Sequence, residues 1–161
     1  MRYTGVALIA LLLLVTLAPT AQAQSKPVQL ALFNPIQLFS ENTSIAGIRL
    51  TLLYGKNTSV SGVDFGLVNH TTSGTSLGWQ EGLVALNEAN FVGLQSCGVN
   101  FNRGNAEGVQ LGVVNHAGSM NGLQLGFINH AGTMKGLQIG LINIIKSGGQ
   151  FPVFPIVNWS F

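Results

Sequence analysis

Apolar and polar residues alternate in a short motif that recurs along the chain. In residues 122–129 the second, fourth and sixth positions are apolar (Leu123, Leu125 and Phe127), and the third and fifth are a glutamine and a glycine. Such alternation is typical of a β-strand with one buried face, because successive side chains of a strand point to opposite sides. We therefore predict strands throughout the repeated region, with their apolar face turned inward.

The motif is a tandem repeat with the consensus G-[LV]-Q-[LI]-G-[LVF]-[VI]-N. Three clear copies begin 14 residues apart, at Gly108, Gly122 and Gly136. Four weaker copies precede them and begin at Gly47, Gly62, Gly78 and Gly93, and degenerate copies lie near residues 28–34 and 154–158. The structural repeat is defined most clearly by Gly108, Gln110, Gly112, Asn115, Gly122, Gln124, Gly126, Asn129, Gly136, Gln138, Gly140 and Asn143. Spacers rich in Gly, Ser, Thr and Asn predict turns between the units.

Two all-β architectures fit this repeat. In a β-solenoid of 14–16-residue units each unit forms one turn, and identical positions of neighbouring turns lie on each other. Leucines would fill the axis, the fifth-position glycine would allow close approach, and the eighth-position asparagines would form a hydrogen-bonded ladder. In a small antiparallel β-barrel or meander, each unit would instead be one strand followed by a turn.

Several features favour the solenoid. All units share one consensus and similar spacers, so each occupies the same environment. Three alternating apolar positions span roughly 13 Å, well short of the apolar band of roughly 25 Å in a membrane barrel. The alternating apolar ending at residues 153–161 resembles the closing strand of outer-membrane barrels and keeps that alternative open. In a solenoid the same segment would cap the last turn.

The first 23 residues have the layout of a secretory signal peptide. Arg2 supplies a positive start, residues 6–17 form an apolar run, and Ala21-Gln-Ala23 matches the cleavage pattern. That run is shorter than the roughly 20 residues of a membrane-spanning helix, and we predict no transmembrane helix in the mature chain. The predicted organisation is a signal peptide at 1–23, an N-terminal lead-in strand or cap at 24–46, a repeat array of about seven units at 47–149 and a C-terminal capping strand at 150–161.

Composition and charge narrow the classes of function. Only 7% of the 161 residues are charged, and the formal net charge is +2. The seven Lys and Arg residues are too few for a phosphate-tracking surface, so we predict no nucleic-acid binding. Cys97 is the only cysteine, which excludes an internal disulfide. It stands in place of the fifth-position glycine, and we expect it to be a small, partly buried filler.

Candidate chemistry is sparse. The acidic residues lie in different units, and Asp64, at the glutamine position, is expected on a solvated face. We predict no catalytic residues, no cofactor and no enzyme activity. His116 and His130 follow the asparagine of adjacent units and would lie about 4.8 Å apart in a solenoid, which makes them a candidate metal-ligand pair. A solvent-facing ladder of turn residues is the favoured interpretation, and we predict no metal site. His70 would be three turns away from His116, too far to supply a third ligand.

The repeat consensus and the ending Phe151-Pro-Val-Phe-Pro-Ile-Val-Asn-Trp-Ser-Phe161 resemble a family of bacterial surface-repeat proteins of spirochaete type. The resemblance covers roughly residues 28–161 and implies a location at the cell envelope or surface, with no established activity and no site residues. We therefore expect an exported, non-enzymatic envelope protein of a bacterium, at the cell surface or in the outer membrane or periplasm. Its role would be structural or binding, its partner an unknown macromolecule or envelope component. A small outer-membrane barrel and a secreted enzyme with an unrecognised site are the alternatives.

Overall fold

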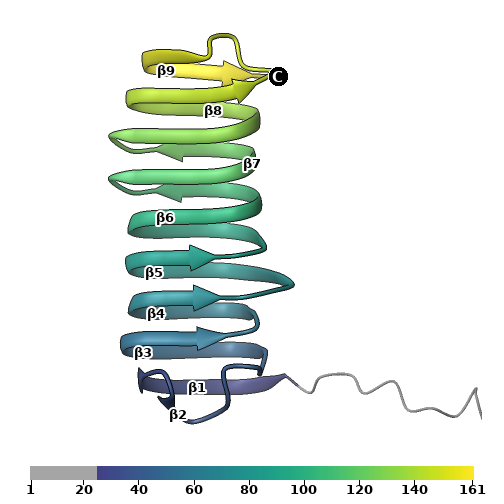
Figure 1. Ribbon diagram of the computed structural model, residues 1–161, viewed down its shortest axis with the longest axis vertical. Coiled ribbons are helices and arrows are strands. Elements are labelled where there is room, and N and C mark those ends of the chain that lie inside the picture. Colours follow the sequence, from purple (N-terminus) through teal and green to yellow (C-terminus); the bar gives the residue numbers. More distant parts are fainter. Residues whose placement is uncertain (1–24) are drawn as a thin grey trace, which may run out of the picture.

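The computed structural model describes residues 25–161, which wind into a β-solenoid (Figure 1). The predicted signal peptide lies outside the described residues. The strands are β1 (Lys26–Phe33), β2 (Ile36–Gln37), β3 (Ile45–Asn57), β4 (Val60–Thr71), β5 (Thr75–Asn87), β6 (Asn90–Leu111), β7 (Val114–Leu125), β8 (Ile128–Ser147) and β9 (Val153–Ser160). They form one sheet in the order β2-β1-β3-β4-β5-β6-β7-β8-β9.

Each turn of the coil contains one repeat unit, and like positions are paired in register. We number the unit from position 1 at Gly122 to position 14 at Lys135. Gly108, Gly122 and Gly136 are direct neighbours along the axis at position 1. All pairs from β1 and β3 to β7 and β8 are parallel. The solenoid prediction is therefore confirmed, because a barrel or meander would pair consecutive strands antiparallel.

Two glycines in each unit permit this close stacking. At position 1 the backbone φ lies between 117° and 149° in all seven copies, a region that L side chains rarely adopt. At position 5 neighbouring turns approach closely, as the sequence predicted. A Cβ added to Gly126 would meet the backbone oxygen of Gly112 and would lie 2.6 Å from Nδ2 of Asn115, both in the preceding turn. A larger residue at position 5 therefore requires a local shift of the backbone and is favoured by a smaller residue at position 8 of the preceding turn.

The prediction of an apolar interior is wrong, because the alternating faces are reversed. Phe127 and Leu141 at position 6 are each 59% exposed, whereas Gln124 and Asn129 are 0% exposed. The interior contains a column of position-3 side chains, namely Gln29, Arg49, Asp64, Gln80, Gln95, Gln110, Gln124 and Gln138. A second buried column, at position 8, contains Asn69, Ala85, Asn100, Asn115, Asn129 and Asn143. Apolar residues of the interior gather only beside these columns, as in the cluster Ala106, Ala117, Met120, Ala131, Met134 and Ile145.

Buried glutamines are stable here because each amide bonds to the identical amide of the next turn. Gln124 Nε2 donates to Gln110 Oε1 at 2.6 Å, and Gln138 Nε2 donates to Gln124 Oε1 at 2.7 Å. A buried polar group is costly only when it lacks a partner. From Gln80 to Gln138 repetition supplies that partner between successive turns, so the polar face of the strand can be the inner one.

The predicted asparagine ladder is confirmed. Asn115 Nδ2 donates to Asn129 Oδ1, and Asn129 Nδ2 to Asn143 Oδ1, both at 2.8 Å. Asn115 Nδ2 also donates to the backbone oxygen of Leu125 in the next turn at 2.9 Å. The asparagine amides thus donate toward the C-terminal turns, whereas the glutamine amides donate toward the N-terminal turns. The amide dipoles of the two ladders therefore point in opposite directions along the axis of the coil.

The glutamine ladder ends at a buried ion pair. Gln80 Nε2 donates to Asp64 Oδ2 at 2.8 Å. Arg49 donates to the same carboxylate through Nε at 2.6 Å and Nη2 at 2.7 Å. Asp64 is 3% exposed and Arg49 is 0% exposed. The expectation of a solvated Asp64 is therefore wrong, since position 3 points into the coil in every turn.

Antiparallel strands cover both ends of the sheet. Strand β9 lies antiparallel on β8, with Asn158 opposite Gln138, so residues 154–158 form no further turn of the coil. At the other end β2 pairs antiparallel with β1. Covered edges of this kind protect a sheet from pairing with other chains. Within residues 25–161, no helix has the length and apolar character needed to cross a membrane.

The asparagine ladder is interrupted where the cysteine stands. Position 8 of one turn is Ala85, and position 5 of the next is Cys97, paired with Gly82. Cys97 is 2% exposed, as expected of a filler, and burial raises the pKa of its thiol to about 12. The thiol is therefore protonated and unreactive at neutral pH. Asn100 Oδ1, which would accept a bond from an asparagine at 85, is buried without a partner in the described part of the chain.

This pairing predicts strong coupling between the two positions. Ala85→Asn alone should lower the free energy of unfolding by about 1–3 kcal/mol, because the new amide meets the Cys97 side chain. Cys97→Gly alone should lower it as well, by leaving a cavity. The double variant should be more stable than either single variant, since the ladder then continues to Asn100. Urea unfolding of the four proteins measures this, and single effects that simply add within about 0.5 kcal/mol would contradict it.

Candidate functional site

Large aliphatic side chains line one edge of the flattened coil. This apolar edge consists of positions 4 and 6 of the turns, is interrupted by Glu81, Ser96 and Gly98, and includes the breaks between β6 and β7 and between β7 and β8, to the left in Figure 1. Its exposed members are Leu30, Leu32, Leu50, Leu52, Leu67, Leu83, Val113, Phe127, Ile139 and Leu141. Large exposed apolar patches on soluble proteins are candidate interaction surfaces.

Charged side chains gather at the opposite edge, where β3, β4 and β5 end (to the right in Figure 1). Arg103 pairs there with Glu88 at 3.0 Å. Lys56, at the end of β3, pairs with Glu41 at 3.3 Å. The coil is therefore amphipathic around its circumference, with one apolar and one charged edge along its length.

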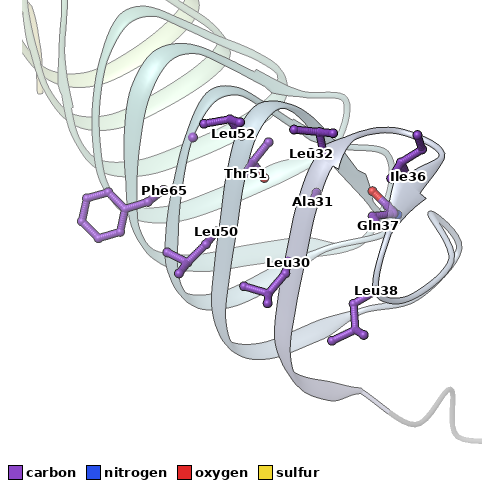
Figure 2. A pocket seen from close by; sticks show the side chains of 11 residues that line it. Leu30, Ala31, Leu32, Ile36, Gln37, Leu38, Leu50, Thr51, Leu52 and Phe65 are labelled. Atoms are coloured by element: carbon purple, nitrogen blue, oxygen red, sulfur yellow. The ribbon is translucent and has the colours of Figure 1, made fainter.

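Two grooves open on the apolar edge. The larger, near the N-terminal end, has a volume of about 710 Å³ and is lined mainly by leucines, together with Ile36 and Phe65 (Figure 2). The second, near the C-terminal end, has a volume of about 400 Å³ and is lined by Gly112, Val113, Gly126, Phe127, Ile139, Gly140, Leu141 and Ile156. Volumes and linings of this kind suit hydrocarbon groups of ligands.

A polar network that the sequence did not predict joins four successive turns. The Tyr54 hydroxyl lies 2.7 Å from His70 Nδ1, and His70 Nε2 lies 3.1 Å from Glu88 Oε1. Arg103 completes the network through Glu88. A phenol, an imidazole and a carboxylate in series are groups used in acid–base chemistry. The adjoining cavity is about 80 Å³, too small for most substrates, so the network ties turns together. Its members belong to different units, which is why no motif revealed it.

The candidate pair His116 and His130 is stacked. The rings of His116 and His130 lie 4.7 Å apart at 9°, close to the predicted spacing, and Phe101 stacks on His116 at 4.4 Å. Their faces are turned toward each other, whereas a metal needs nitrogen lone pairs that converge on one point. Burial lowers the pKa of both histidines, which favours neutral rings at pH 7. In the part of the chain that the structure covers, no group of three or more His, Cys, Asp or Glu side chains could hold a metal.

The apolar edge is the most extensive feature of this surface, and sequence reasoning missed it by turning the leucines inward. One signal could have revealed it. Glutamine occupies position 3 in the five successive copies that begin at Gly78 to Gly136, while the neighbouring positions 2 and 4 vary among Leu, Val, Ile, Trp, Glu and Ser. Invariance at a polar position indicates a repeated partner, not solvent. Comparison with known proteins finds no matching family model, and no curated protein or solved structure matches the chain.

Proposed function

We propose that the protein is an exported, non-enzymatic component of the cell envelope that attaches to the lipid of a membrane surface through the apolar edge. The observation that carries this proposal is the concentration of exposed aliphatic side chains at positions 4 and 6, on the edge opposite the surface ion pairs. An amphipathic body of this kind lies in a membrane interface with its apolar side in the acyl region, as amphipathic helices do. The signal-like layout of residues 1–23 supports export.

Lipid fits the apolar edge better than a protein partner does. The edge is convex, because the chain turns there from one face of the coil to the other. Two convex ridges touch along a line, whereas fluid hydrocarbon closes around a ridge. The side chains are mainly Leu, Ile and Val, while protein interfaces are enriched in Tyr, Trp, Met and Arg. Transfer of each half-exposed leucine to hydrocarbon would gain roughly 1 kcal/mol.

The backbone of the coil also suits contact with lipid. Hydrocarbon cannot bond to peptide groups, so a surface in lipid must satisfy its own N–H and C=O groups. In this coil the backbone bonds run along the axis between parallel turns, from β3 to β8. The outward faces therefore present side chains, and the apolar edge can enter hydrocarbon with few unpaired backbone groups.

Vesicle flotation tests the proposal. The mature chain should float with phosphatidylcholine vesicles. The double variant Phe127→Ser/Leu141→Ser should bind about 10- to 30-fold more weakly, because two exposed anchors are lost. The matched control, Lys135→Ser/Lys146→Ser, removes charges away from the apolar edge and should bind as the unchanged protein does. Circular dichroism confirms folding of each variant. Absence of flotation, or equal binding by all three proteins, would overturn the proposal.

A further inference from the structure

A single carboxylate interrupts the apolar edge. Glu81 occupies position 4 of its turn, directly beside Phe65 of the preceding turn and Ser96 of the next. Glu81 pairs with no cation among residues 25–161, whereas Glu41, Asp64 and Glu88 all do. Within its own strand, Glu81 accepts a hydrogen bond at Oε2 from Trp79 Nε1, at 3.2 Å. An unneutralised charge thus follows the apolar residues Leu30, Leu50 and Phe65 in their column.

Aromatic rings flank this carboxylate. Trp79 is 42% exposed. Its ring packs edge-to-face against Phe65, with the ring centroids 5.0 Å apart and an interplanar angle of 69°. Aromatic faces and a carboxylate both attract a cation, and the attraction grows where water is partly excluded. An organic ammonium group matches this combination, because its carbon substituents contact the rings while its charge faces the carboxylate.

The N-terminal groove shares Phe65 with the aromatic pair beside Glu81. Phe65 lines that groove and also contacts Trp79, so it belongs to both features. Figure 2 shows Leu30, Leu50 and Phe65 on three successive turns, and Glu81 follows them in register on the fourth. From Leu30 to Glu81 the column therefore covers three inter-turn spacings, about 14 Å at roughly 4.8 Å each. An extended alkyl chain could lie along this column with its head beside Glu81.

We propose that the groove and Glu81 together bind a membrane lipid whose headgroup carries an ammonium group. The alkyl chain lies along Leu30, Leu50 and Phe65, and the ammonium lies between Glu81 and Trp79. This inference rests on the proposed function, since it names the lipid chemistry that the apolar edge selects. The rest of the edge supplies attachment to hydrocarbon without regard to the headgroup.

Fluorescence of Trp79 tests this site in solution. In a Trp159→Phe background Trp79 is the remaining tryptophan of the chain. Dodecyltrimethylammonium, titrated below its micelle concentration, should change its emission, and dodecyl maltoside serves as the neutral-headed probe with the same chain. Glu81→Gln should weaken binding of the ammonium probe by about three- to tenfold. It should change binding of the maltoside by less than about twofold, and Leu50→Ser should weaken binding of both.

The outcomes separate this site from the general membrane attachment. Equal effects of Glu81→Gln on both probes would overturn the ammonium site, even if the protein still floats with vesicles. If Glu81→Gln weakens binding of the ammonium probe alone but the protein does not float with vesicles, the membrane attachment is overturned and the ammonium site stands. An unchanged urea midpoint of Glu81→Gln shows that the substitution leaves the fold intact, because Glu81 lies on the outer face of the coil.

Discussion

Asp64→Asn is expected to lower the free energy of unfolding by about 3–5 kcal/mol, the cost of leaving a buried charge without its partner. The Arg49 guanidinium is 0% exposed and makes two bonds to the Asp64 carboxylate, at 2.6 and 2.7 Å. An asparagine at 64 keeps the shape but removes the opposing charge. Urea unfolding followed by circular dichroism measures the difference.

The control for this result replaces both members of the pair. Arg49→Gln/Asp64→Gln continues the glutamine ladder through the two turns, and we expect its stability to lie within about 1 kcal/mol of the unchanged protein or above it. Well-packed neutral replacements of a buried ion pair are often as stable as the pair. A loss below about 1 kcal/mol for Asp64→Asn alone would contradict the buried pair, as would a double variant less stable than that single one.

Gln110→Leu is expected to cost about 2–5 kcal/mol, although it places an apolar side chain in the interior. Gln110 Nε2 donates to Gln95 Oε1 at 2.9 Å, and Gln110 Oε1 accepts from Gln124 Nε2 at 2.6 Å. Leucine removes both bonds. Gln95 Oε1 then accepts only from Asn102 Nδ2, and Gln124 Nε2 donates only to the backbone oxygen of His130. The same unfolding measurement gives the size of the loss.

The reverse exchange on the outer face is the matched control. Leu141→Gln should change stability by less than about 0.5 kcal/mol, because Leu141 is 59% exposed. An interior filled by leucines would give the opposite ranking, with Leu141→Gln the damaging change and Gln110→Leu the mild one. The two variants together therefore decide which face of the strand is buried.

Much of the architecture could be predicted from the spacing of a few residues. The 14-residue separation of Gly108, Gly122 and Gly136 places these glycines on each other, and the same argument brings His116 and His130 into contact. These predictions succeeded because a tandem repeat assigns like residues to like environments, whatever the detailed fold. The Tyr54–His70–Glu88 network could not be found in this way, since its members occupy different positions of their units.

The candidate site was missed for a physical reason that Gln124 illustrates. In a single strand the amide of Gln124 is a polar group that prefers water, so the alternating leucines are assigned to the interior. In the coil Gln124 bonds to Gln110 below and Gln138 above. Asp64 was misplaced by the same reasoning. The apolar edge, its two grooves and the position of Glu81 all follow from this reversal.

The sequence by itself determined the period of the repeat and the residues that occupy like positions in successive units. A repeat of nearly constant length, 14–16 residues, leaves little choice in these, because shifting one unit would mismatch every column at once. The structure decided that successive units pair in parallel. Only the tertiary structure decided which face lies inside. An amide side chain lacks a partner within its own strand and gains one only when an identical turn is stacked about 4.8 Å away. That gain depends on neighbouring turns, so no pattern within one unit expresses it.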